Sequence, residues 1–128
     1  TWTGEGLAFR GGTDRGVQIG VDSDGAEGQT PMQLLLMALG SCMAVDVLMI
    51  LQKSRVSVEA LEVEAIGVRA DTVPKRYRSV ELVYRLRGPS EGDQPKLERA
   101  IALSRERYCS VLHTLDPELD LEIRVERD

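Results

Sequence analysis

The stretch LLLMALGSCMAVDVLMIL, residues 34–51, is the most apolar part of the chain, and it determines how the rest must be arranged. It is long enough to cross a membrane and carries a single charge, Asp46. A carboxylate near the middle of a membrane span costs roughly 2.5–3.5 kcal/mol, and no second apolar stretch of this length follows. We therefore interpret the stretch as the core helix of a globular domain and predict no membrane association.

Thr30 and Pro31 provide a start signal for this helix. A threonine hydroxyl can accept a hydrogen bond from a free amide of the first turn, and proline at the first helical position loses no hydrogen bond there. We expect the helix to run from about Pro31 to Lys53, because the positive charge of Lys53 is favourable at the negative end of a helix.

The composition indicates one ordinary globular domain, residues 1–128, with 42% hydrophobic and 29% charged residues. A formal net charge of −5 argues against the basic surface that nucleic-acid binding requires. Two cysteines are too few for a disulfide framework, and the N-terminus has no export signal pattern. We therefore expect a cytoplasmic protein with reduced thiols.

The segments around the core helix indicate an α+β fold. Alternating apolar and polar residues predict strands over 2–9, 16–22, 56–71, 78–88 and 119–128. A second, amphipathic helix is predicted over 93–108, followed after a kink by a helical segment over 109–115. We expect antiparallel sheets wrapped around the central buried helix. A helix that is apolar on every side must be covered on every side, so we also infer a homodimer.

Cys42 and Asp46 lie one turn apart on the core helix. A free cysteine often packs as a small hydrophobic residue, so a purely structural role is one interpretation. Two features favour a chemical role. Gly40 and Ser41 are small enough to let a substrate or a second backbone approach, and Asp46 needs a partner because an unpaired buried carboxylate is unfavourable.

Cys109 follows SRERY, where a new helical turn is expected to begin. Helix amides together with Arg105 and Arg107 would lower the pKa of this thiol, so we expect thiolate character. His113 is the only histidine, and we interpret it as a surface or cap residue. A metal site of Cys42, Asp46, Cys109 and His113 is the alternative, but no CxxC or HxxxH pattern supports it and we predict no metal.

Three segments in combination resemble the OsmC/Ohr family, the osmotically inducible protein C and organic hydroperoxide resistance proteins. They are TPMQLLLMALGSCMAVDVLMILQK at 30–53, VEALEVEAIGVRADTVPKRYRSVELVYRLRG at 58–88, and LERAIALSRERYCSVLHTL at 97–115. The likeness extends over nearly the whole chain and is closer to the OsmC-like branch than to the Ohr branch.

The resemblance implies an OsmC-like fold, an intertwined homodimer with active sites at the subunit interface, and no cofactor. It implies that Cys42 is the peroxidatic thiol and Cys109 the resolving thiol. Thiolate attack on an organic hydroperoxide would leave Cys42 as a sulfenic acid. Cys109 would then condense with it to a disulfide, which an external dithiol reduces. The implied role is peroxidase activity in defence against oxidative and osmotic stress.

The resemblance also implies an arginine from the N-terminal hairpin that holds the thiolate, for which Arg15 is our first choice and Arg10 our second. An apolar mouth that includes Met32, Leu36 and Met43 would suit alkyl or lipid hydroperoxides. Met32 stands where the family has a carboxylate that orients the arginine. This departure favours one alternative, a non-catalytic protein of the same fold that binds a small lipid-like ligand.

Overall fold

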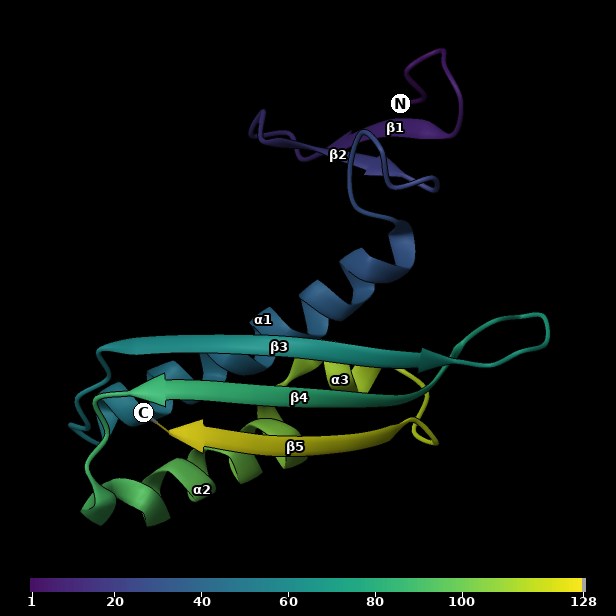
Figure 1. The fold of residues 1–128 in the computed structure, drawn as a ribbon. Coiled ribbons are helices and arrows are strands. Elements are labelled where there is room, and N and C mark those ends of the chain that lie inside the picture. The colour runs from purple at the N-terminus through teal and green to yellow at the C-terminus, as the bar shows by residue number, and fades with distance from the viewer. Residues whose placement is uncertain (128) are drawn as a thin grey trace. The chain divides into compact units, whose positions relative to one another are not determined.

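The computed structural model describes residues 1–127 and divides into two compact units, with the boundary between Met37 and Ala38 (Figure 1). We describe each unit by itself. The order of elements matches the prediction, two strands, a long helix, two strands, helices and a last strand. The α+β fold class is therefore confirmed.

The N-terminal unit is built on a hairpin of β1 (Ala8–Gly12) and β2 (Gln18–Asp22), which pair antiparallel. Gly20 and Gly28 allow the following loop to pack closely on β2, because a Cβ on either residue would collide with backbone. The alternation over 16–22 predicts a half-buried strand face with Val17 and Ile19 on it, but both residues are exposed. The reason is that a two-stranded hairpin offers no second layer to cover them within residues 1–37.

Helix α1 spans Pro31–Lys53, as predicted. Thr30 caps it reciprocally with Gln33. The Gln33 backbone N–H donates to Thr30 Oγ1 at 3.2 Å, and the Thr30 N–H donates to Gln33 Oε1 at 2.9 Å. This capping box satisfies two groups that a helix start would otherwise leave free, and it fixes where the helix begins.

The second unit contains a three-stranded sheet in the order β3 (Ala60–Arg69), β4 (Tyr77–Arg87), β5 (Asp120–Arg127). The pairing of β3 with β4 shifts in register between Val68 and Arg69. β3 and β4 are antiparallel, but β5 runs parallel to β4, which corrects the expectation of purely antiparallel sheets. The helices between β4 and β5 supply the crossover that a parallel pair requires.

These connecting elements lie, with α1, on one face of the sheet (Figure 1). They are the short η1 (Glu91–Asp93), helix α2 (Gln94–Leu103), the π-helical segment η2 (Ser104–Tyr108) and helix α3 (Ser110–Thr114). The spacing over 93–108 places Tyr108 near one helix face with Leu97 and Ile101, but Tyr108 is half exposed at the end of the π turn, whereas Leu97 is fully buried.

The core of the second unit lies between this sheet face and the helices. It includes the expected inward row of β4 and a four-residue-spaced row of α1, that is Val80, Leu82, Tyr84, Leu86, Leu39, Met43, Val47 and Leu51. Another face of α1 remains exposed, with Val45 at 55% and Met49 at 49%. By length and composition alone α1 would pass as a membrane span, a test that core helices also pass, so this finding is weak support for a membrane role.

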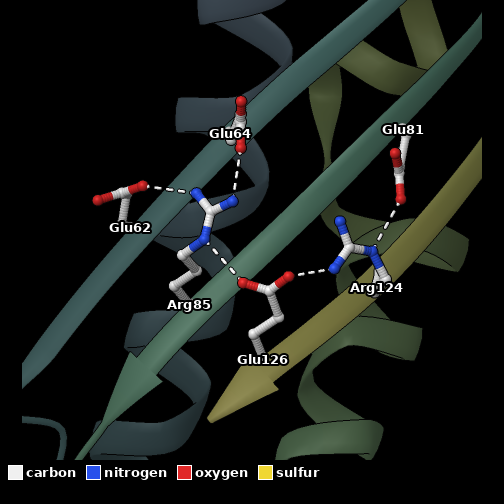
Figure 2. Close-up of polar contacts among 6 residues, drawn as sticks. All are labelled: Glu62, Glu64, Glu81, Arg85, Arg124 and Glu126. Atoms are coloured by element: carbon white, nitrogen blue, oxygen red, sulfur yellow. Dashed lines mark hydrogen bonds and ion pairs between the residues drawn. The ribbon is translucent and has the colours of Figure 1, made fainter. Parts of the chain in front are cut away.

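The opposite face of the sheet is polar. Arg85 in the middle strand bonds to Glu62 and Glu64 of β3 and to Glu126 of β5, with distances of 2.7 to 2.8 Å (Figure 2). Arg124 extends the cluster to Glu126 and Glu81. These ion pairs cross both strand boundaries and link all three strands on this face.

Candidate functional site

Cys42, Asp46 and Cys109 come together in the second unit. One side-chain ligand atom of each residue lies within 4.8 Å of the others. Both cysteines are free thiols. Cys42 is partly exposed, Asp46 is partly exposed, and Cys109 is fully buried.

Helix α1 supplies the first two members of this cluster. Cys42 and Asp46 share a helix face because residues four apart are neighbours on an α-helix. Gly40 faces β3, and a Cβ at this position would make ordinary van der Waals contacts, 3.7 Å from Val63 Cγ1 and 3.8 Å from Ala65 Cβ. A longer side chain at Gly40 would push the helix, and the cluster on it, away from the sheet.

The π-helical segment supplies the facing side of the cluster. The Cys109 backbone N–H donates to the Ser104 carbonyl at 2.9 Å, a bond across five residues that closes the π turn. Ser104 and Cys109 are both completely buried. The Ser104 hydroxyl donates to Asp46 Oδ2 at 2.9 Å, which gives this carboxylate the partner that its position requires. Wide turns of this kind are frequent at functional sites.

Cys109 caps helix α3, and its sulfur accepts a hydrogen bond from the Leu112 backbone N–H at 3.3 Å. Burial nevertheless raises the pKa of the thiol to about 11, against the smaller lowering effect of the Leu112 N–H. The hydrogen bond with Cys42 and the charge of Asp46 raise it further. The expected thiolate character of Cys109 is therefore wrong. Arg105 and Arg107 are exposed and do not offset the burial.

Tyr84 is a neighbour that the sequence did not single out. Its position in the alternation of β4 predicted an apolar packing role, and its side chain is indeed fully buried. Its hydroxyl, however, is buried without a hydrogen-bond partner among the described residues. Burial, and then the charges of Cys109 and Asp46, raise the pKa of this phenol, which places it beside the cluster.

The four-donor metal set that the sequence left as an alternative is not assembled among the described residues, because His113 lies outside the cluster. Its ring Nε2 is 3.1 Å from the Arg105 carbonyl and its side chain is exposed, in agreement with the interpretation as a surface residue. The three remaining groups are two thiols and a carboxylate. Such a set is also suited to thiol–disulfide chemistry, which needs no metal.

The other expected site residues are placed as follows. Arg10 lies in β1 and Arg15 in the turn after it, both exposed and both in the N-terminal unit. Met32 and Leu36 are partly exposed on the first two turns of α1. Met43 is completely buried in the core. The functional roles of these five residues stay predictions.

Comparison with known proteins supports the resemblance. The family model described as OsmC-like protein matches residues 23–124. Protein YhfA of Escherichia coli K12 is 36% identical over 118 residues, which are 91% of this chain and 87% of YhfA. A hypothetical protein from Aquifex aeolicus VF5 has a TM-score of 0.83 at 36% identity, covering 95% of this chain and 88% of the other.

The fold extends to more distant proteins. The organic hydroperoxide resistance protein OsmC from Legionella pneumophila has a TM-score of 0.63 at 16% identity, with 98% of this chain and 99% of the other covered. At this identity the likeness concerns the fold alone. Together with the family match, these structures confirm that the fold is OsmC-like.

Proposed function

Because the chain belongs to the OsmC-like protein family, we propose that it is a thiol-dependent peroxidase that reduces organic hydroperoxides. Family membership supports a redox or peroxide-stress role in general. The specific reaction is inferred from the cluster of Cys42, Asp46 and Cys109. The observation that carries the proposal is that two free thiols, far apart in the sequence, lie within 4.8 Å of each other and differ in exposure.

This difference in exposure supports the assignment of roles. Cys42 is partly exposed and can meet a substrate, whereas Cys109 is sealed in the core. With a pKa of about 11, the Cys109 thiol is protonated near neutral pH and is a poor first nucleophile. Cys42 is therefore the peroxidatic residue and Cys109 the resolving residue.

The reaction balances in three steps. The Cys42 thiolate attacks the O–O bond of the hydroperoxide, becomes a sulfenic acid, and releases an alkoxide that takes up a proton to leave as the alcohol. The Cys109 sulfur then displaces the sulfenic hydroxyl, which leaves as water, and a Cys42–Cys109 disulfide forms. An external dithiol reduces this disulfide by two exchange reactions and restores both thiols.

We further propose that the active form is a homodimer that covers the exposed face of α1. Met37, Val45 and Met49 are each about half exposed there, on the most apolar helix of the chain. In this proposal Arg15, or else Arg10, holds the Cys42 thiolate, and Met32 and Leu36 contribute to an apolar mouth for the alkyl group.

Turnover of cumene hydroperoxide with an external dithiol tests this function. We expect consumption of peroxide by the wild type, complete loss in Cys42→Ser, and single-turnover oxidation without a disulfide in Cys109→Ser. Mass spectrometry of the wild type after one equivalent of peroxide should show an intramolecular disulfide. Turnover by Cys42→Ser at the wild-type rate would contradict the proposal.

The same assay addresses the alternative of a ligand-binding protein without activity. Met32 in place of the family carboxylate favours that alternative. It predicts no peroxide consumption by the wild type, together with saturable binding of a fatty acid or fatty alcohol to both the wild type and Cys42→Ser.

A further inference from the structure

The buried state of Cys109 creates a chemical requirement for the resolving step. Thiolate, rather than thiol, is the nucleophile in attack on a sulfur centre. Because burial raises its pKa well above the ordinary thiol value, the Cys109 thiol is protonated near pH 7. The step therefore needs a group that removes the Cys109 proton as the new S–S bond forms.

Asp46 is placed to be that group. It is the one carboxylate in the cluster, and one of its oxygens lies within 4.8 Å of both sulfur atoms. Other acidic or basic side chains of the neighbouring segment point elsewhere. Arg105, Glu106 and Arg107 are exposed, and the His113 ring contacts the Arg105 carbonyl. From β4, Tyr84 faces the same region, but its phenol is neutral at pH 7, as ordinary phenols are, and burial raises its pKa further.

The surroundings of Asp46 hold the carboxylate in position but do not use all of its hydrogen-bond acceptor sites. The buried Ser104 hydroxyl donates to Oδ2 at 2.9 Å. An ionised carboxylate offers about four lone-pair sites, so one hydrogen bond leaves it able to accept a proton. The π turn that buries Ser104 also carries Cys109 through the Cys109 N–H to Ser104 carbonyl bond. One local backbone feature therefore positions both the thiol and the hydroxyl that orients the base.

We propose that Asp46 is the general base of the resolving step, and that Ser104 is the residue that positions it. As the Cys109 sulfur bonds to Cys42, its proton passes to the Asp46 carboxylate. The hydroxyl that leaves the Cys42 sulfenic acid then takes up this proton and departs as water, so that Asp46 returns to its starting state. In the peroxide cycle this role rests on the proposed function.

The role of Asp46 as general base can be tested without a peroxide, by using the aromatic disulfide dithiobis(nitrobenzoic acid). Cys42 displaces one coloured nitrothiobenzoate and retains the other as a mixed disulfide. Cys109 then attacks the Cys42 sulfur, and a second nitrothiobenzoate leaves. The rate of the second release measures Cys109 attack alone, and Cys109→Ser should show only the first release.

We expect Asp46→Asn to give the first release and to slow the second by at least about 100-fold at neutral pH, since general-base catalysis contributes typically 10²–10⁴-fold. Asparagine has the same shape and can still accept the Ser104 hydrogen bond, which makes it the matched variant. Ser104→Ala keeps the base but loses its orientation, so it should slow the second release to a smaller extent. Equal second-release rates in the wild type and Asp46→Asn would overturn the proposal.

The pH dependence of the second release is a readout that a purely structural role of Asp46 would not change. The profile of the wild type alone already tests the base. With an internal base, the second release should be nearly independent of pH between about pH 7 and pH 9. In Asp46→Asn it should rise about tenfold per pH unit toward the Cys109 pKa, because hydroxide must then generate the thiolate. A tenfold rise per unit in the wild type would exclude the base, even if Asp46→Asn does not fold.

The peroxide reaction separates this proposal from the proposed function. If Cys42 reacts with cumene hydroperoxide, Asp46→Asn should accumulate a sulfenic acid that dimedone traps, while the wild type proceeds to the disulfide. If Cys42 does not react with the peroxide, the peroxidase proposal is wrong, and the two releases from the aromatic disulfide still decide the role of Asp46.

Discussion

At the scale of single residues, Cys109 is subject to two opposing effects. Its position at the start of α3 gives it the Leu112 amide, which lowers the pKa of the thiol. Its complete burial raises the pKa, and burial is the larger effect. The result is a thiol that stays protonated near neutral pH. A protonated resolving cysteine would also protect the reduced protein from premature disulfide formation.

The raised pKa of Cys109 should make the free energy of unfolding depend on pH. Between the ordinary thiol pKa of 9.0 and about 11, the unfolded state loses the Cys109 proton while the folded state retains it. The unfolded state then binds fewer protons, so stability falls as pH rises through this range. Urea unfolding of the reduced protein at pH 8 and at about pH 10.5 should show this loss.

Cys109→Ser is the matched control for this dependence, because serine has a similar size and does not ionise in this range. Its stability should fall less between the two pH values than that of the wild type. Cys42→Ser tests whether the partly exposed thiol contributes, and we expect it to retain most of the wild-type slope. If the stability of Cys109→Ser fell with pH as steeply as that of the wild type, the pH dependence would not come from the buried Cys109 thiol.

The sequence allowed the two cysteines to be identified, but not their protonation states or their polar neighbours. Cys42 and Asp46 share a helix face by spacing alone, so their proximity was predictable. Ser104 and Tyr84 were not, because each is a single polar group within an apolar pattern, and only the tertiary fold shows which pattern residues face a thiol. The sequence offered one signal for Ser104, namely that a serine lies on the apolar side of the helix predicted over 93–108.

At the scale of elements, local patterns predicted the type of each element better than its pairing. The alternation of Leu121, Ile123 and Val125 predicted β5 correctly. It did not indicate that β5 would run parallel to β4, since alternation is the same for either direction. The π turn after Leu103 was likewise beyond prediction, because it depends on the buried contacts of Ser104 and Cys109.

Arg85 joins all three strands of the second unit (Figure 2). Arg85→Ala should lower the urea midpoint of the protein more than Arg87→Ala does, because Arg87 forms one ion pair among residues 1–127, with Glu59, on an exposed strand end. The difference should shrink in high salt, which screens charges at the surface. Equal midpoints for the two variants at low salt would show that the network does not stabilise the sheet.

At the scale of the whole molecule, α1 has more apolar surface than the described residues of one chain bury. Within its 23 residues, only Leu39, Gly40, Met43, Val47 and Leu51 are buried. A chain with such an exposed apolar helix would tend to associate. The commonest closed assembly is a twofold-symmetric homodimer, in which the same face of each subunit forms the interface. This excess of apolar surface is the physical basis for the proposed homodimer.

Val45→Glu tests the homodimer. Val45 is 55% exposed on α1, so a glutamate is tolerated in a monomer but would place an unpaired charge in an interface between two α1 helices. Light scattering after size-exclusion chromatography should give a dimer mass for the wild type and a monomer mass for Val45→Glu. Ile66→Glu is the matched control, because Ile66 is 43% exposed on the outer sheet face, and this variant should remain dimeric. A dimer of Val45→Glu as stable to dilution as the wild type would place the interface elsewhere.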